Sequence, residues 1–195
     1  VEVAANDGYL LQYFKECNIP CTGIEPTAST AAAAREKGIS IVEEFFGVAL
    51  AQKLASQGKK ADLIVANNVL AHVPEINDFV SGFTTLLKPN GVATFEFPHL
   101  LNLINENQFD TIYHEHFSYL SLTALETIFK ENGIQIFDVE EYLTHGGSLR
   151  LFAQRSDTGV QTVSEQVTEL RKREIDAGMG SDNFYKNFQE KANIV

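Results

Sequence analysis

Apolar residues follow two different periods along the chain, and the two periods predict strands and helices in turn. Short runs rich in Val, Ile and Phe recur between segments whose apolar residues are spaced three or four apart. The predicted strands are residues 1–4, 21–25, 40–43, 61–67, 91–97, 134–142 and 148–155. The predicted helices are residues 9–17, 28–37, 48–57, 76–87 and 122–132, and Gly38, Gly58, Gly91 and Gly133 fall where helices should end.

Strands that alternate with helices indicate a mostly parallel sheet with helices on both faces. The last two predicted strands differ, because only residues 143–147 separate them and a parallel crossover needs about a dozen residues. These two strands must pair antiparallel. We therefore expect an α/β fold with a Rossmann-like, mostly parallel seven-stranded sheet and a terminal antiparallel strand.

The character of the chain changes after residue 155 to polar, charged sequence. Val163, Val167 and Leu170 keep a helical spacing, and a Gly178-Met179-Gly180 break precedes a second helical segment at 184–192. Two interpretations are open: a helical connector (156–195) to a missing C-terminal domain after a first domain (1–155), or an amphipathic helix packed on the sheet. Because the chain starts inside a predicted buried strand, we expect it to be a piece of a longer protein.

Composition excludes several classes of protein. The 195 residues include 15 Lys and Arg against 26 Asp and Glu, a net charge of −11, without the clustered cations that bind nucleic acid. Cys17 and Cys21 are too few for a disulfide framework, and no apolar stretch is long enough for a membrane helix. We expect a cytoplasmic monomer with neither a nucleic acid nor a membrane as partner.

The turn after the first strand is the first candidate binding element. Ligands of open parallel sheets bind at the carboxyl ends of strands, and here the sequence is Ala4-Ala5-Asn6-Asp7-Gly8. Two of the three glycines of a dinucleotide fingerprint are missing, which disfavours a bound pyrophosphate. The turn fits a ligand without phosphates, or an ordinary strand-to-helix turn with Asp7 near the helix start.

The next two strand ends carry carboxylates and aromatic rings. Glu25 ends the second strand, where an acidic side chain accepts hydrogen bonds from ribose hydroxyls; its alternative role is a charge at the following helix N-terminus. After the third strand, Glu44, Phe45 and Phe46 offer a carboxylate and an aromatic surface for an adenine. Alternatively, at least one of the two phenylalanines belongs to the core.

Histidines gather behind the later strands. The five histidines all follow the fourth, fifth or sixth strand: His72, His99, His114, His116 and His145. Asn67 and Asn68 end the fourth strand, where polar groups are costly to bury without a task. The alternatives are a zinc site around His114 and His116, structural histidines bonded to the backbone, and acid–base chemistry in which a Tyr or Glu orients a neutral imidazole. The mixture of Tyr, Glu and His favours acid–base chemistry.

A glycine pair marks the corner before the last strand. In His145-Gly146-Gly147-Ser148 the glycines would let backbone amides approach a phosphate or a sugar closely, although a tight corner alone also requires them. Arg150 lies just inside the last strand, where it faces either a ligand phosphate or neighbouring carboxylates.

Several of these blocks together resemble one known family. The blocks are Asn6-Asp7-Gly8, Glu25-Pro26, Phe45-Phe46, residues 67–74, residues 96–99, residues 108–116 with Tyr113-His114-Glu115-His116, and residues 144–150. They are similar to the S-adenosylmethionine-dependent sugar C-methyltransferases, which act on nucleotide-linked 4-keto deoxysugars. The similarity covers residues 1 to about 155 and implies a class I methyltransferase domain.

The resemblance assigns roles to residues. It implies that S-adenosylmethionine is bound by Ala4, Asn6, Asp7, Gly8, Glu25, Pro26, Glu44, Phe45, Phe46, Asn67 and Asn68. It implies that the nucleotide-linked keto sugar is bound by His99, His145, Gly146, Gly147, Ser148 and Arg150. S-adenosylhomocysteine would be the product of the cofactor.

The resemblance also implies a mechanism. His116 would be the general base that removes the proton at sugar C3, and Tyr113, Glu115 and His72 would complete the pocket. The family's N-terminal zinc module is missing from this chain together with its cysteines, so no metal is expected. Two alternatives are a domain that binds S-adenosylmethionine without turnover and an NAD-dependent nucleotide-sugar epimerase or dehydratase; the absence of a Tyr-x-x-x-Lys motif disfavours the epimerase.

Overall fold

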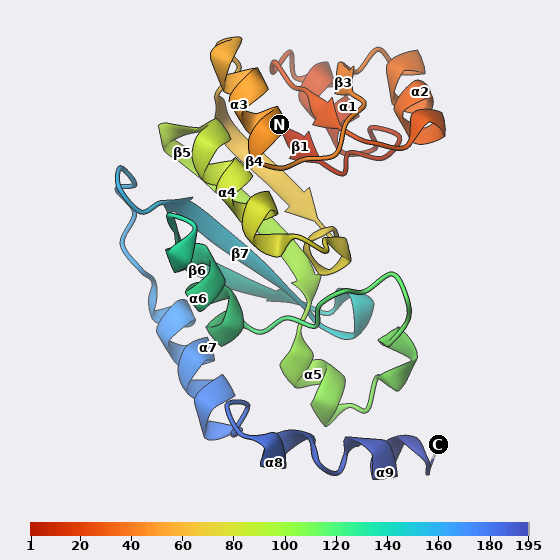
Figure 1. The fold of residues 1–195 in the computed structure, drawn as a ribbon, viewed down its shortest axis with the longest axis vertical. Coiled ribbons are helices and arrows are strands. Elements are labelled where there is room, and N and C mark those ends of the chain that lie inside the picture. Colours follow the sequence, from red (N-terminus) through yellow and green to blue (C-terminus); the bar gives the residue numbers. More distant parts are fainter. Residues whose placement is uncertain (195) are drawn as a thin grey trace.

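A single seven-stranded sheet organises the computed structural model, which describes residues 1–194 (Figure 1). Its strands are β1 (Glu2–Val3), β2 (Gly23–Ile24), β3 (Ile41–Val42), β4 (Ala61–Asn67), β5 (Leu87–Pro98), β6 (Ile134–Tyr142) and β7 (Ser148–Arg155). They lie in the order β3-β2-β1-β4-β5-β7-β6, and β7 is antiparallel to both of its neighbours. The expected mostly parallel sheet with one antiparallel strand is confirmed. That strand is last in the chain but lies inside the sheet.

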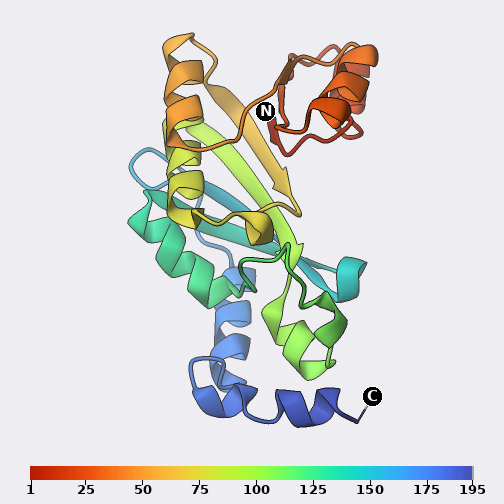
Figure 2. The same cartoon turned by 45° about the vertical axis from the view of Figure 1, so that its right-hand side comes forward.

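Helices cover both faces of the sheet. From β1 to β3 each new strand is added on one side of β1, and β4 and β5 are added on its other side. Because the crossovers are right-handed, these two directions place their helices on opposite faces of the sheet. One face carries α1 (Leu11–Glu16) and α2 (Ala28–Glu36), and the other carries α3 (Val48–Ser56), α4 (Ile76–Leu86) and α6 (Leu122–Glu131) (Figures 1 and 2). A small apolar cluster lies at α1 and α2, and the main core includes residues of α3, α4 and α6.

A row of phenylalanine rings forms the centre of the main core. Phe46 lies 5.1 Å from Phe83, Phe83 lies 4.5 Å from Phe95, and Phe95 lies 4.7 Å from Phe129, measured between ring centroids. The row crosses from the loop after β3 through α4 and β5 to α6. Each fully buried phenylalanine contributes about 1.5–3 kcal/mol of burial free energy, so this row holds the sheet against its helices.

The first helix of the C-terminal segment packs on the sheet. Helix α7 (Glu165–Asp176) lies against β6 and α6 and buries Val167, Leu170 and Glu174. The predicted helix 184–192 is two short helices, α8 (Asp182–Tyr185) and α9 (Phe188–Ala192). The amphipathic-helix interpretation therefore describes α7.

Two details differ from the predicted elements. Gly91 does not end a helix, because β5 begins directly after α4 and Gly91 lies inside that strand, where a Cβ would sit 2.8 Å from the Ala61 carbonyl. Helix α5 (Leu100–Asn105) was not predicted. Across residues 1–194, the helices are all too short or too polar to cross a membrane.

Candidate functional site

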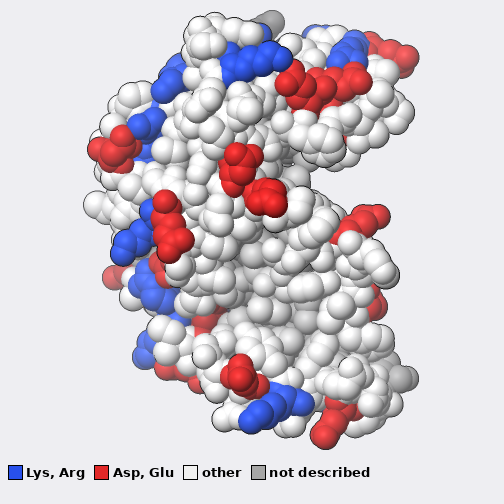
Figure 3. All heavy atoms as spheres, viewed as in Figure 1, with Lys and Arg blue, Asp and Glu red and all other residues white. Residues whose placement is uncertain are grey.

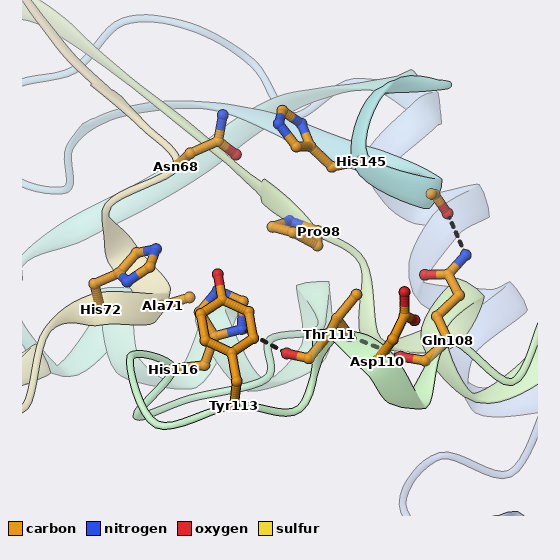
Figure 4. A pocket seen from close by; sticks show the side chains of 11 residues that line it. Asn68, Ala71, His72, Pro98, Gln108, Asp110, Thr111, Tyr113, His116 and His145 are labelled. Atoms are coloured by element: carbon orange, nitrogen blue, oxygen red, sulfur yellow. Dashed lines mark hydrogen bonds between the residues drawn. The ribbon is translucent and has the colours of Figure 1, made fainter. Parts of the chain in front are cut away.

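A cavity of about 480 Å³ lies at the carboxyl ends of β4 and β5, where the open-sheet rule predicts a ligand (Figure 4). Its walls are Asn68, Ala71, His72, Pro98, Gln108, Asp110, Thr111, Tyr113, His116, His145 and Gly146. Three of the five histidines therefore meet in one cavity. Neither lysine nor arginine is among the residues that line it.

The ring of His116 is held in a defined orientation. Its Nδ1 lies 3.0 Å from the Thr111 carbonyl oxygen, which can only accept, so Nδ1 carries a hydrogen and, in the neutral ring, Nε2 carries the lone pair. Tyr113 stacks on the same ring at 4.3 Å between centroids, and His72 lies at 4.8 Å (Figure 4). The hydrogen bond that orients the ring is made to a backbone carbonyl, and Tyr113 adds a contact between ring faces rather than a hydrogen bond.

The segment that carries His116 is tied to the rest of the cavity at both ends. The Phe117 and Ser118 amides donate to the Ala71 carbonyl, which joins this segment to the turn that follows β4. At the other end, Gln108 donates through Nε2 to the Gly146 carbonyl at 2.7 Å and so joins the segment to the corner before β7 (Figure 4). Two loops that are distant in sequence thus form one wall.

The corner before β7 has a left-handed backbone at three successive residues. The φ angles are 54° at His145, 75° at Gly146 and 105° at Gly147. A Cβ on Gly146 would lie 2.6 Å from the Gln108 amide, and one on Gly147 would lie 2.2 Å from Asn102. The glycine pair is therefore required by close packing and by conformation, and it leaves His145 and Gly146 at the cavity wall.

Four residues expected to bind substrate are not among those that line the cavity: His99, Gly147, Ser148 and Arg150. His99 is 1% exposed, outside the cavity, and its Nε2 lies 2.8 Å from Glu174. Ser148 is buried and donates to the Thr144 carbonyl. Arg150 donates to Glu96 at 2.7 and 3.1 Å and its guanidinium lies over the Tyr142 ring, so it pairs with a neighbouring carboxylate.

Glu115 and His114 are also outside the cavity. Both side chains are exposed to solvent, although their neighbours Tyr113 and His116 line the wall. Glu115 therefore does not complete the pocket as expected. No cluster of three or more His, Cys, Asp and Glu side chains suited to a metal ion occurs in the described part of the chain.

The turn after β1 is built around Glu25. This carboxylate is 4% exposed, and it accepts hydrogen bonds from the Asn6 amide at 3.1 Å and the Thr27 amide at 2.8 Å. Ala4 and Asn6 have left-handed φ angles of 58° and 49°. Glu25 thus holds the turn and also takes its alternative role at the start of α2, while its oxygens retain lone pairs for further donors.

Gly8 and Asp7 have packing partners at the same turn. A Cβ on Gly8 would lie 2.3 Å from Ile39 Cδ1 and 3.2 Å from Ala34 Cβ, so the glycine permits contact between the turn, α2 and the residues that follow α2. Asp7 is half-buried and pairs with Lys37 at 2.7 Å, which lowers the pKa of the Asp7 carboxyl below its ordinary value. Asp7 does not cap α1, which has no side-chain cap.

The two adjacent phenylalanines after β3 have opposite environments. Phe46 packs edge-on against Phe79 and Phe83 in the core, whereas Phe45 is 85% exposed. Glu44 is exposed and pairs with Lys53. Phe46 therefore belongs to the core, and only Phe45 offers a free ring face.

The end of β4 places two asparagines in different positions. Asn67 Oδ1 is buried without a hydrogen-bond partner among the described residues. Asn68 has a left-handed φ of 51°, donates from its amide to the Glu96 carbonyl at 2.8 Å, and lines the cavity (Figure 4). Pro26, at the end of β2, is half-buried.

Five residues of the cavity were missed as candidate site residues: Ala71, Pro98, Gln108, Asp110 and Thr111. The last three belong to the block 108–116, which the sequence analysis identified as a whole. The sequence did not show which residues of that block face the cavity. Thr111 acts through its backbone carbonyl, for which its residue type gives no signal.

Two family models match consecutive parts of the chain. Residues 1–139 match a family described as methyltransferase domain, and residues 143–195 match one described as C-methyltransferase C-terminal domain. Among curated proteins, C-methyltransferase NovU of Streptomyces niveus is 32% identical over 188 residues. That match covers 96% of this chain but only 44% of NovU, so the chain spans less than half the length of this relative.

Solved structures share the fold at low sequence identity. Magnesium protoporphyrin IX methyltransferase from Synechocystis PCC 6803, determined with bound SAH, has a TM-score of 0.61 and 17% identity, over 80% of this chain and 73% of that one. A possible histamine N-methyltransferase from Thermotoga maritima has a TM-score of 0.59 and 15% identity, over 78% of this chain and 79% of that one. The NAD-dependent epimerase alternative receives no support from these matches.

Proposed function

The chain belongs to the methyltransferase-domain family, and from that premise we propose that it is the catalytic domain of an S-adenosylmethionine-dependent C-methyltransferase acting on C3 of a nucleotide-linked 4-keto deoxysugar. Carbon as the methylated atom is supported by the match of residues 143–195 to a C-methyltransferase C-terminal domain and by the identity to NovU. The keto sugar is supported by the chemistry of the cavity.

The strand ends beside the cavity fit the methyl donor. A nucleoside offers ribose hydroxyls to a carboxylate, and Glu25 is a buried carboxylate with remaining lone pairs at the end of β2. Asn67 Oδ1 is a buried acceptor that needs a donor. Phe45 offers an exposed ring for a base to stack on. When bound, S-adenosylmethionine supplies an electrophilic methyl group.

The observation that carries the proposal is the hydrogen bond from His116 Nδ1 to the Thr111 carbonyl. It leaves Nε2 as the basic nitrogen of a histidine that lines the cavity, which is what proton abstraction requires. A C–H beside a ketone becomes acidic enough for an imidazole once donors stabilise the enolate oxygen. Tyr113, His145 and Asn68 supply such donors from the same walls.

The charge of the cavity favours a hydroxylated, uncharged group. Its polar lining consists of amides, hydroxyls, imidazoles and Asp110, without lysine or arginine. A diphosphate requires cations or clustered amides, whereas a sugar ring requires mixed donors and acceptors. The keto sugar ring is therefore the part of the substrate that we place in this cavity, with the diphosphate outside it.

In the proposed reaction His116 Nε2 removes the C3 proton, and the electrons of the C–H bond move to the C4 oxygen as an enolate. C3 would then bond to the donor's methyl carbon as the C4 ketone re-forms. The methyl–sulfur bond would break with its electron pair left on sulfur, so that S-adenosylhomocysteine would be the leaving group. Tyr113 and His72 pack against the His116 ring and hold the base against the substrate. His116 finally gives its proton to solvent.

The test separates proton abstraction from methyl transfer. In D₂O, with S-adenosylhomocysteine in place of the donor, NMR follows loss of the C3 proton of a nucleotide-linked 4-keto deoxysugar. His116→Gln should slow this exchange at least about 100-fold, the usual contribution of a general base, and leave S-adenosylhomocysteine affinity unchanged. His114→Gln is the matched control, because His114 is exposed outside the cavity.

Each outcome decides one part of the proposal. Unchanged exchange in His116→Gln would remove His116 as the base. Calorimetric titration with S-adenosylhomocysteine, with NAD as control, tests the donor separately; binding of NAD alone would overturn the assignment of the donor.

A further inference from the structure

We propose that Glu174, on helix α7, is a positioning residue for the substrate cavity: through His99 it sets the His145–Gly147 corner, and through the α6 N-terminus it sets the segment that follows His116. The inference rests on the proposed function only where it concerns acceptor binding. Glu174 lies in the part of the chain matched by the C-terminal family model, whereas His99 and α6 lie in the methyltransferase domain.

Glu174 is a fully buried carboxylate whose oxygens accept three hydrogen bonds. Oε1 lies 2.8 Å from His99 Nε2 and accepts from the Leu122 amide at 2.7 Å, and Oε2 accepts from the Thr123 amide at 2.8 Å. Its exposed fraction is 0%. A buried carboxylate is retained only when its oxygens are satisfied, and here the partners all belong to the methyltransferase domain.

The first connection runs through His99 to the corner before β7. The ring is 1% exposed and its Nε2 faces Glu174, so the carboxylate fixes the ring. The His99 amide donates to the Gly147 carbonyl at 2.9 Å, and Gly147 follows directly on the cavity residues His145 and Gly146. His99 therefore joins α7, which its ring contacts, to this wall, to which its backbone amide donates.

The second connection runs to the segment behind His116. Leu122 and Thr123 begin α6, and the preceding Leu120 carbonyl accepts from the Leu100 amide at 2.9 Å. Leu120 also forms a parallel bridge with His99. The corner before β7 and the segment after His116 therefore both contact His99. Glu174, on α7, holds the His99 ring by a hydrogen bond.

The hydrogen bonds assign the tautomer of His99. Burial by itself would raise the pKa of Glu174, but the bonds from His99, Thr123 and Leu122 outweigh burial and lower it below the ordinary 4.5. Glu174 is therefore an ionised acceptor, and His99 Nε2 carries the hydrogen. The other ring nitrogen, Nδ1, is buried without a partner among the described residues.

The experiment compares Glu174→Gln and His99→Leu with Glu126→Gln. Glu126 forms an ion pair with Arg171 on the same α6–α7 interface, so its variant weakens that interface without touching the cavity loops. Hydrogen exchange by mass spectrometry should be at least tenfold faster in peptides covering 143–149 for Glu174→Gln and His99→Leu. Glu126→Gln should leave these peptides unchanged.

Two readouts separate positioning from general loosening. Glu174→Gln should raise KM for the keto sugar nucleotide about tenfold, while S-adenosylhomocysteine affinity stays within twofold, because Glu25 and the β1 turn lie on other elements. Faster exchange confined to α7, or the same pattern in Glu126→Gln, would make Glu174 a simple anchor of that helix and overturn the proposal. The hydrogen-exchange result tests the positioning role even if the sugar nucleotide is the wrong acceptor. If Glu174→Gln does not fold, the exchange of His99→Leu tests the same connection.

Discussion

Three residues in the turn after β1 have left-handed backbone, and only one of them is glycine: φ is 58° at Ala4, 49° at Asn6 and 75° at Gly8. This conformation costs an alanine about 1–2 kcal/mol, and such strain collects where a turn has a task. The Asn6 amide is held by Glu25, the residue that we propose meets the ribose. The turn after β1 therefore combines a strained backbone with the carboxylate that we propose binds the ribose.

Substitutions at Gly8 and Ala4 should change stability in opposite directions. Gly8→Ala places a Cβ 2.3 Å from Ile39 Cδ1 at a left-handed φ, so we expect the free energy of unfolding to fall by about 1–3 kcal/mol. Ala4→Gly relieves the backbone strain but adds the entropy cost of glycine. We therefore expect the free energy of unfolding to rise by between zero and about 1 kcal/mol. Urea unfolding measures both; equal losses would contradict this account.

Phe45 and Phe46 form a natural matched pair. Phe46→Ala removes a ring that packs on Phe79 and Phe83, and should cost about 3–5 kcal/mol of unfolding free energy. Phe45→Ala, at 85% exposure, should change stability by less than about 0.5 kcal/mol and weaken S-adenosylhomocysteine binding instead. Calorimetry and urea unfolding on both variants check the assignment, and unchanged binding in Phe45→Ala would remove Phe45 from the donor site.

At the level of elements, the strand ends determine where the chemistry lies. Strands β4, β6 and β7 have the predicted bounds, and helices α1 to α4 and α6 differ from prediction by one or two residues at an end. The placement of β7 between β5 and β6 brings the His145 corner to the ends of β4 and β5. The cavity therefore needs the one strand that breaks the parallel pattern.

The bonds of Glu174 to α6 and His99 give helix α7 a pH-dependent anchor. Its folded pKa lies below the ordinary 4.5, so the stabilisation is fully present above about pH 5 and is lost as the pH falls through the folded value. Glu174→Gln should cost about 1.5–3 kcal/mol near pH 7, and the difference from the unmutated chain should narrow towards pH 3. Urea unfolding from pH 7 to pH 3 measures this, and a difference that stays constant with pH would contradict it.

At the scale of the whole molecule, a net charge of −11 acts on any anionic substrate. Figure 3 shows a deep hollow on one side of the molecule in which no Lys or Arg side chain is visible. The cavity lining also lacks these residues. A nucleoside diphosphate sugar would therefore approach this chain against its field.

Ionic strength should reveal this repulsion. Because salt screens charges beyond about 10 Å at 0.1 M, we expect association of the chain with a nucleotide-linked keto sugar to strengthen severalfold between 20 and 200 mM salt. S-adenosylhomocysteine binding, which has no phosphate, is the control and should change little. Weaker sugar-nucleotide binding at high salt would show that cations of this chain hold the diphosphate.

The sequence by itself determined the alternation of strands and helices, the antiparallel last pair and the strand ends where the polar residues lie, because hydrophobic period and turn residues are local properties. It also singled out His116, Tyr113, His72 and His145, which do line one cavity. It did not separate them from His99, which has the same residue type and also follows a strand.

Tertiary structure alone decided which polar residues share a cavity and which satisfy one another. His99 meets Glu174 across 75 residues of chain, and Arg150 meets Glu96 across 54, contacts that no local pattern encodes. His116 is oriented by a backbone carbonyl, which every residue carries and which only the path of the chain can aim. Local sequence therefore supplies the chemistry, and the packing of distant segments assigns each group to a ligand or to the fold.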